Sequence, residues 1–224
     1  MMNRLLDRLE SKIGRHKGVR NLMTIISVGI AIVFAADLLL PQLLGGAALS
    51  DYLRFDKAAI MRGQIWRLLT FVFVPMNSNL LWLIFSLYFY WLMGEQLQNE
   101  WGTFRFTLFY TVGMLGTVLA GCFTGYATSY YLNMSVLLAA AIVRPNMPMR
   151  FYGVIELRLK WFALISLAMM LLPVLQNGAW QEIAVIAVAL LNVLLFFIDH
   201  LIGAVKDAWR RYQWKRNWRS GWKR

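Results

Sequence analysis

Long apolar segments alternate with short charged segments along this chain. Six segments are almost free of charged residues, at 21–44, 79–97, 106–123, 126–143, 161–176 and 180–198. A helix needs ~20 mostly apolar residues to cross a hydrocarbon core that is ~30 Å thick. The glycines at 121 and 125 and the Asn177-Gly178 pair provide turns between neighbouring segments. The pattern therefore predicts an all-α membrane protein with six transmembrane helices.

The composition agrees with this prediction. Of the 224 residues, 59% are hydrophobic and 15% are charged, and the mean hydropathy is +0.54. A soluble domain carries ~25% charged residues. The single cysteine, Cys122, excludes a disulfide within the chain. The first apolar segment follows a basic start and has no small-x-small cleavage site, which indicates a retained anchor and not a signal peptide.

The distribution of basic residues predicts the orientation in the membrane. The net charge is +12, and the Lys and Arg residues flank the apolar segments. Of the 23 basic residues, the segment 45–78 holds only Arg54, Lys57, Arg62 and Arg67. In a six-span arrangement all the others lie on the side of the two termini. The positive-inside rule then places both termini in the cytoplasm and makes 45–78 an outer loop.

The chain is expected to have a basic N-terminal segment at 1–20, a membrane domain at 21–200 and a basic tail at 201–224. In the tail, Trp214, Trp218 and Trp222 recur every four residues with Lys and Arg between them. Tryptophan at the headgroup level combined with positive charge is typical of an interfacial helix on an anionic leaflet. The tail therefore favours anionic lipid over nucleic acid as a partner.

The outer loop is rich in apolar residues for a solvated segment. Ser50 and Asp51 provide capping groups for a short helix. The large apolar side chains that follow are Tyr52, Phe55, Ile60, Ile65 and Trp66. They predict one or two amphipathic segments that lie at the outer interface.

Three motifs resemble the rhomboid superfamily of intramembrane proteases and their inactive relatives. GQIWRLLTFVF at 63–73 resembles the first-loop signature of that superfamily, and it contains Trp66 and Arg67. The motifs with Gly94 and with Gly102 and Arg105 are similar to the family's pattern at the end of its second core helix and the start of its third. Gln98 stands where the family usually has a glutamate. MSVLLAAAIVRPNMPMRFYG at 134–153 is similar to derlins. The resemblance covers about 45–200 and implies a rhomboid-like bundle.

The resemblance also implies where protease chemistry would lie. A rhomboid protease uses a serine on the fourth helix and a histidine on the sixth as general base. Here the candidate serines are Ser129 and Ser135, and Asn192 stands where the base belongs. An amide is no useful base at neutral pH.

The oxyanion pair of the second helix is also replaced. Trp82 and Ser86 stand at its two positions. The two histidines of the chain, His16 and His200, lie before the first apolar segment and at the cytoplasmic end of the last one. The sequence therefore predicts a pseudoprotease without the Ser-His dyad, and not an enzyme.

By resemblance to derlins, the expected function is recognition of membrane-protein clients in quality control or trafficking. An active protease with an unusual site and a small transporter or lipid-handling protein remain as alternatives. The short loops favour a prokaryotic plasma membrane, with the endoplasmic reticulum as second choice. No metal cluster or cofactor motif is present in the sequence, so none is expected.

Several polar and small residues have a structural interpretation. The resemblance implies that Arg67 donates to loop carbonyl groups and so holds the outer loop against the core. Asn192 is expected to hydrogen-bond between helices, with Ser135 and Asn133 as candidate partners. Asp37, a carboxylate within an apolar segment, is a candidate functional residue. Small residues recur every four positions and predict close helix packing, at Gly113, Thr117, Gly121 and Gly125.

Overall fold

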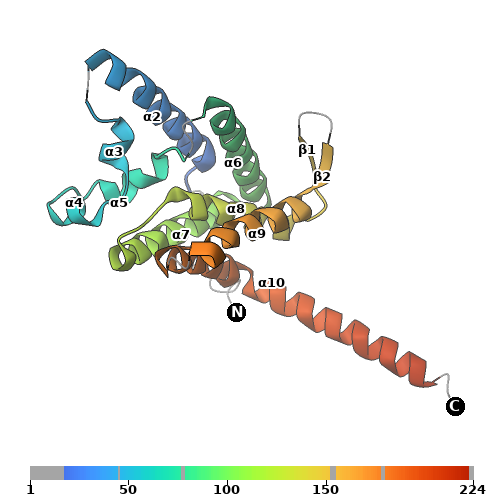
Figure 1. The fold of residues 1–224 in the computed structure, drawn as a ribbon. Helices are drawn as coiled ribbons and strands as arrows, with labels where there is room; N and C mark the ends of the chain where they lie inside the picture. Colours follow the sequence, from blue (N-terminus) through green and yellow to red (C-terminus); the bar gives the residue numbers. More distant parts are fainter. Residues whose placement is uncertain (1–17, 45, 77–78, 152–154, 178–179, 222–224) are drawn as a thin grey trace.

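The structure is a computed structural model that describes residues 18–44, 46–76, 79–151, 155–177 and 180–221. Its elements are α2 (Leu22–Leu44), α3 (Leu49–Leu53), α4 (Lys57–Met61), α5 (Arg67–Thr70), the 3-10 helix η1 (Phe71–Phe73), α6 (Leu80–Trp101), α7 (Thr103–Thr124), α8 (Ser129–Val143), β1 (Pro148–Phe151), β2 (Ile155–Arg158), α9 (Leu159–Asn177) and α10 (Trp180–Gly221). Figure 1 shows these elements as one bundle of helices with the short helices α3–α5 at its edge. Each of the six predicted apolar segments is a helix, namely α2, α6, α7, α8, α9 and α10.

Three of these helices are long and apolar enough to cross a membrane. They are α2 over Leu22–Gln42, α6 and α7. The apolar parts of the other three, within the described residues, are shorter and cover Ser129–Val143, Leu159–Leu172 and Glu182–Ile198. A 15-residue helix such as α8 is only ~22 Å long at ~1.5 Å per residue. The structure thus supports a membrane protein with three candidate spanning helices, and the six-span topology with cytoplasmic termini stays a prediction.

Helix α8 lies at the centre of the bundle. It packs against α6, α7, α9 and α10. Most of its side chains are buried, and Leu132, Ser135 and Leu137 are at most 1% exposed. The run of alanines at 139–141 lets neighbouring helices approach closely, because small side chains keep the backbones near each other.

Glycines and capping side chains define where the helices end. Gly102 has φ +84° and forms the joint between α6 and α7, and Gly125 has φ +80° and ends α7 in a left-handed conformation. Such conformations favour glycine because it has no Cβ. Asn79 caps α6 and Thr128 caps α8 through their side-chain oxygens.

The connection between α8 and α9 is an antiparallel β-hairpin, so the prediction of an all-α chain was wrong at this point. Strand β1 pairs with β2 in a register that joins Met149 to Leu157 and Pro148 to Arg158. The sequence from 147 to 158 places apolar residues at alternate positions on both sides of the turn, which is the period of a strand. We call the end of the bundle that holds this hairpin and the α6–α7 joint the hairpin end. The opposite end, next to residues 46–76, is the loop end.

Helix α10 continues well beyond the bundle, as Figure 1 shows. The predicted boundary between membrane domain and tail at residue 200 falls inside this continuous helix. Of the tail tryptophans, the side chain of Trp214 is described and is 62% exposed. The side chain of Trp218 and the whole of Trp222 lie outside the described residues.

Candidate functional site

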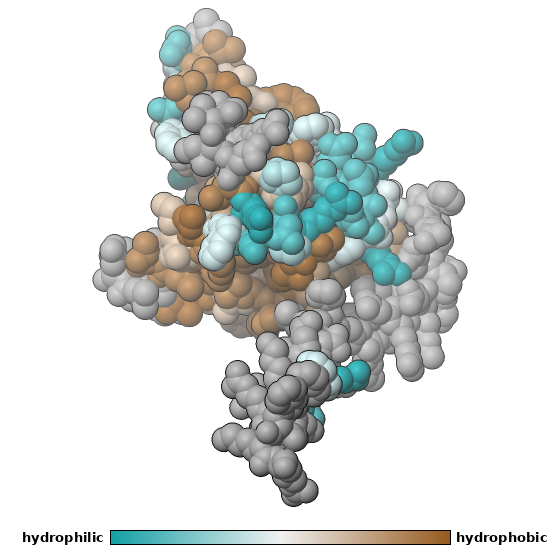
Figure 2. All heavy atoms as spheres, turned by 90° about the vertical axis from the view of Figure 1, so that its right-hand side faces the viewer, coloured by the Kyte–Doolittle hydropathy of each residue, from teal (hydrophilic) through white to brown (hydrophobic). Residues whose placement is uncertain are grey.

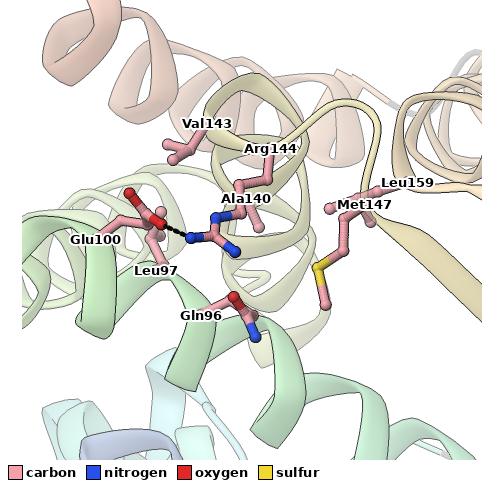
Figure 3. A pocket seen from close by; sticks show the side chains of 8 residues that line it. All are labelled: Gln96, Leu97, Glu100, Ala140, Val143, Arg144, Met147 and Leu159. Atoms are coloured by element: carbon pink, nitrogen blue, oxygen red, sulfur yellow. Dashed lines mark ion pairs between the residues drawn. The ribbon is translucent and has the colours of Figure 1, made fainter.

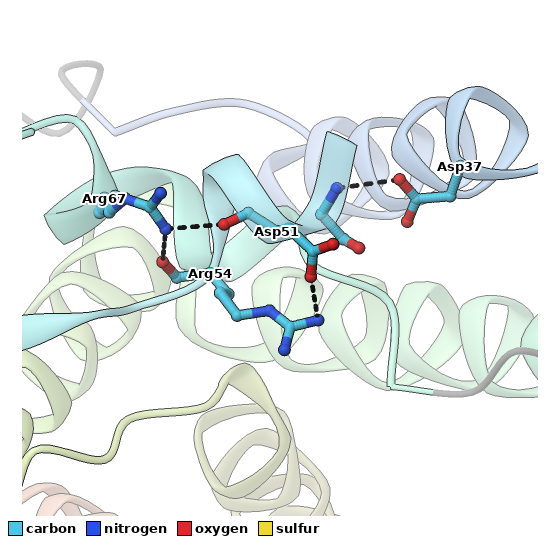
Figure 4. Close-up of polar contacts among 5 residues, drawn as sticks. Asp37, Asp51, Arg54 and Arg67 are labelled. Carbon is cyan, nitrogen blue, oxygen red and sulfur yellow. Dashed lines mark hydrogen bonds and ion pairs between the residues drawn. The ribbon is translucent and has the colours of Figure 1, made fainter. Parts of the chain in front are cut away.

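The short helix α3 is held in place from α2 at its N-terminus. The backbone N–H of Ser50 donates to Asp37 Oδ1 at 2.9 Å (Figure 4). The first N–H groups of a helix have no partner within it, and a carboxylate there also complements the helix dipole. Asp37, the candidate functional residue, thus has a structural contact. The expected caps Ser50 and Asp51 lie inside the first turn of α3, which begins after Ala48.

Arg67 holds the opposite end of α3. Its Nη1 atom donates to the carbonyl oxygens of Asp51 at 2.8 Å and Arg54 at 2.9 Å (Figure 4). Its Nε atom donates to Gln64 Oε1 at 2.7 Å, and the residue is only 6% exposed. A buried guanidinium with three such bonds has one defined position. Arg67 therefore joins α5 to the carbonyl end of α3.

Two neighbours of Arg67 complete this contact. Trp66 Nε1 donates to the carbonyl oxygen of Tyr52 at 3.3 Å, and Thr70 Oγ1 donates to that of Leu53 at 3.0 Å. The four successive carbonyl groups at 51–54 thus all accept from side chains of the segment WRLLT. We call Asp37, Trp66, Arg67 and Thr70 the loop clamp.

The loop also packs directly on the bundle through Phe55. This side chain is buried and makes an edge contact with Phe71, with ring centroids 6.4 Å apart. A Cβ atom on Gly121 would lie 2.8 Å from both the Phe55 ring and the Ala127 side chain. Gly121 therefore provides the space in which the loop meets α7 and the α7–α8 turn.

At the centre of the bundle, Asn192 bonds to a different partner from those expected. Its Nδ2 atom donates to the carbonyl oxygen of Phe109 on α7 at 3.2 Å, and the residue is 5% exposed. The candidate partners were wrong, since Asn133 Oδ1 accepts from the Tyr110 hydroxyl at 3.3 Å and Ser135 bonds within α8. The Oδ1 atom of Asn192 is buried and has no hydrogen-bond partner among the described residues.

Gly113 makes room for this amide. A Cβ atom at position 113 would lie 2.7 Å from Asn192 Nδ2 and also 2.7 Å from Leu132 Cδ1. Thr117, one turn further along α7, is 1% exposed and donates to the carbonyl oxygen of Gly113 at 2.9 Å. Within the small-residue repeat on α7, Gly113 therefore packs against α8 and α10, whereas Gly121 contacts Phe55 and Ala127, and Gly125 ends the helix.

The candidate serines are buried in α8 at different depths. Ser135 is fully buried, and its hydroxyl donates to the carbonyl oxygen of Leu132 at 2.6 Å. Ser129 is 3% exposed and begins the helix. A nucleophile and its base must lie within ~2.6–3.2 Å of each other. Across the described part of the chain, neither hydroxyl is hydrogen-bonded to a titratable side chain.

The two candidate positions on α6 make contacts within their own helix. Trp82 is 65% exposed and contacts Phe85 edge-on, with centroids 6.5 Å apart. The Ser86 hydroxyl donates to the carbonyl oxygen of Leu83 at 2.9 Å. Of the histidines, His16 lies outside the described residues, and only the backbone of His200 is described, as part of α10.

The remaining motif residues lie at the hairpin end. A Cβ atom on Gly94 would overlap the side chain of Met23, so this glycine lets α2 and α6 cross closely. Arg105 is half-buried in the first turn of α7. Glu100 and Arg144 form an ion pair that joins the ends of α6 and α8 beside a shallow pocket (Figure 3). Figure 2, from the hairpin side, shows hydrophilic side chains gathered between hydrophobic surfaces.

A further polar group lies at the loop end. Burial raises the pKa of Tyr126 in the α7–α8 turn, and the carboxylate of Glu182 raises it further. Glu182 Oε2 is itself buried without a hydrogen-bond partner in the part of the chain that the structure describes. Within the same residues, no cluster of His, Cys, Asp or Glu has the geometry to hold a metal ion.

A family model described as "Eukaryotic integral membrane protein (DUF1751)" matches residues 20–198, which is most of the chain. The chain belongs to this family. The DUF1751 family is classed within the rhomboid-like superfamily. No curated protein matches the chain. The family is described as eukaryotic, so the prediction of a prokaryotic plasma membrane was wrong. Short loops are a property of many compact membrane bundles and do not define the organism.

Some residues of the DUF1751 bundle were missed by sequence reasoning. Thr70 belongs to the loop clamp, and its spacing of three from Arg67 places both on one face of a helical turn. Asp37 was singled out as a carboxylate within an apolar segment, but its hydrogen bond to Ser50 could not be predicted, because it depends on how α2 and α3 pack. Phe109 is the partner of Asn192 through its backbone, which no residue-type pattern reveals.

Proposed function

We propose that this DUF1751 protein is a catalytically inactive, rhomboid-like membrane protein that binds transmembrane segments of client proteins. The role is similar to that of derlins, in quality control or trafficking of membrane proteins. The observation that carries the proposal is a row of aromatic side chains on α6 that starts at the exposed Trp82 and ends at the buried Phe89, where α6 contacts α9.

This face consists of aromatic side chains at helical spacing. Trp82 contacts Phe85, and Phe85 stacks on Phe89 with centroids 6.3 Å apart. Phe89 then contacts Phe162 of α9, with centroids 4.6 Å apart and ring planes at 60°. At the loop end, Trp82 lies in the first turn of α6 and is exposed. We call Trp82, Phe85 and Phe89 the aromatic face.

Helix α9 presents apolar side chains on the same side beyond Phe162. Ile165 and Met169 follow Phe162 at spacings of three and seven residues, and they are 53% and 63% exposed. Large aromatic and Met side chains adapt to varied partners, because they offer much contact area and few polar demands. A client helix with an irregular surface fits between two such helices.

Two observations support the absence of peptide-bond hydrolysis. Asn192 stands at the position of the family's base, and its amide donates to a backbone carbonyl group. The Ser135 hydroxyl donates to the carbonyl of its own helix. Neither arrangement activates a nucleophile. Asp37 bonds to the backbone of Ser50, which does not favour a transport role for that carboxylate.

The test is site-specific photocrosslinking in native membranes. A photoreactive amino acid replaces Trp82 or Met169 in separate variants, and Leu191 on α10, which is 60% exposed, is the matched control. We expect adducts with membrane proteins from positions 82 and 169 that exceed those from position 191 by at least several fold. Equal adducts from all three positions, or adducts with lipid alone, would refute the proposal.

A further inference from the structure

A second apolar surface lies on another side of the bundle, between α8, α9 and α10. It is a groove of about 540 Å³, within the ~300–1,000 Å³ range of ligand sites. The largest apolar side chains that line it are those of Leu138, Ile142, Leu164, Leu167, Leu190 and Leu194. None of the described lining residues is acidic.

The groove is present because the side chains at its base are small. Ala141 on α8 and Ala163 on α9 are 9% and 5% exposed and lie at its base. Next to them, Leu164 and Leu194 are 55% and 48% exposed, so the walls stay uncovered by protein. In a bilayer this surface faces hydrocarbon, and the occupant must be largely apolar.

One polar side chain lines the groove, and it defines the headgroup level. Lys160 lies in the first turn of α9, and its Nζ atom is 5.5 Å from the ring centroid of Trp161. Trp161 is 53% exposed. A tryptophan and a lysine at the start of an apolar helix are typical of the membrane–water interface. The groove runs from that level towards the middle of α10.

We propose that this groove is a binding site for a phospholipid with a net negative headgroup. The phosphate pairs with Lys160, and the proximal part of an acyl chain lies along Leu164, Leu167 and Leu194. The ammonium group beside an apolar groove favours an anionic partner, because a charge near hydrocarbon is stabilised by an opposite charge. The proposal is independent of client binding, since it uses a different surface.

The experiment uses the full-length protein in phosphatidylcholine nanodiscs that contain a small fraction of one photoreactive lipid. The probes are phosphatidylserine and phosphatidylcholine with a diazirine in the same acyl chain, and labelled peptides are mapped by mass spectrometry. We expect phosphatidylserine to label the α9 and α10 peptides about fivefold more than phosphatidylcholine, as one lysine near an anionic headgroup implies. Equal labelling by both probes would mean annular lipid only and would overturn the proposal.

Two variants separate the headgroup contact from the acyl contact. Lys160→Gln is expected to remove the preference for phosphatidylserine, whereas Lys57→Gln, on an exposed loop helix, leaves it unchanged. Leu164→Trp fills the groove from its exposed rim and is expected to reduce labelling by both probes several fold. A thermal unfolding curve equal to that of the unmodified protein shows that each variant is folded. A preference that survives Lys160→Gln, or labelling that survives Leu164→Trp, would contradict the proposed site.

Discussion

The loop clamp and the Asn192 site use polar side chains in opposite ways. In the loop clamp, Asp37 and Arg67 bond to the backbone at the two ends of α3. At the Asn192 site, one amide donates a single bond to Phe109, and its oxygen has no partner among the described residues. The loop clamp holds the short helix α3 in place. Asn192, in contrast, lies between helices whose backbone groups are already hydrogen-bonded within each helix.

The difference shows which part of the rhomboid resemblance is structural. The side chains of the loop motif donate hydrogen bonds to the four successive backbone carbonyl groups at 51–54. Of the positions that resemble the protease site, Ser86 and Ser135 bond within their own helices, and Asn192 bonds to the backbone of α7. Trp82 is exposed on the aromatic face. The comparison therefore predicts unequal effects of substitution in the two regions.

The largest effect is expected for Arg67→Met. This change keeps an apolar stem of similar length but removes three hydrogen bonds, two of them to the carbonyl groups of Asp51 and Arg54 at the end of α3. Leaving such groups unpaired costs ~1–3 kcal/mol each, so we expect a loss of about 3 kcal/mol in the free energy of unfolding. Trypsin should also cleave sooner after Arg54 and Lys57 in detergent micelles.

The matched control for this prediction is Arg62→Met. Arg62 lies in the same loop and is exposed, so its replacement should change stability by less than ~0.5 kcal/mol. A loss of similar size in both variants would mean that loop charge, and not the loop clamp, stabilises the fold.

A smaller effect is expected at the second region for Gly113→Ala. The added Cβ atom would lie 2.7 Å from both Asn192 Nδ2 and Leu132 Cδ1. Such overpacking typically costs ~1–3 kcal/mol. The double variant Gly113→Ala, Asn192→Ala should lose less stability than the sum of the single variants, because truncation of the amide relieves one of the two clashes. Strictly additive losses would show that a glycine at position 113 is not needed to accommodate the Asn192 side chain.

The smallest effect is expected for Asn192→Leu. The change removes one interhelical hydrogen bond, worth about 0.6 kcal/mol in membranes, and also removes the unpaired buried oxygen. The melting temperature in detergent should therefore change little. A loss above ~3 kcal/mol would mean that the amide oxygen has a partner essential for the fold, and the contrast between the two regions would fail.

Much of the fold was predictable because hydrophobic runs define helices directly. All six apolar segments are helices, and Gly102 and Gly125 mark joints where the backbone needs a positive φ. The role of Arg67 as a donor to loop carbonyl groups was predictable from the resemblance of the Trp66-Arg67 motif to the rhomboid first-loop signature.

Other features depended on how the helices are rotated against each other. Helices that are apolar on most sides carry little periodic signal for which side faces inward. The partner of Asn192 could therefore not be read from spacing, and neither could the meeting of Phe89 with Phe162. The hairpin at 148–158 was missed because its two strands have only four residues each.

The central claim is that the protein holds client helices without cutting them. The most direct measurement is the mass of the client that crosslinks to a photoreactive residue at position 82. The account predicts adducts with full-length clients, and the same client masses when Ser129 and Ser135 are both replaced by alanine. Adducts with truncated clients that become full-length in the Ser129→Ala, Ser135→Ala variant would contradict it, because they would show an active protease at this site.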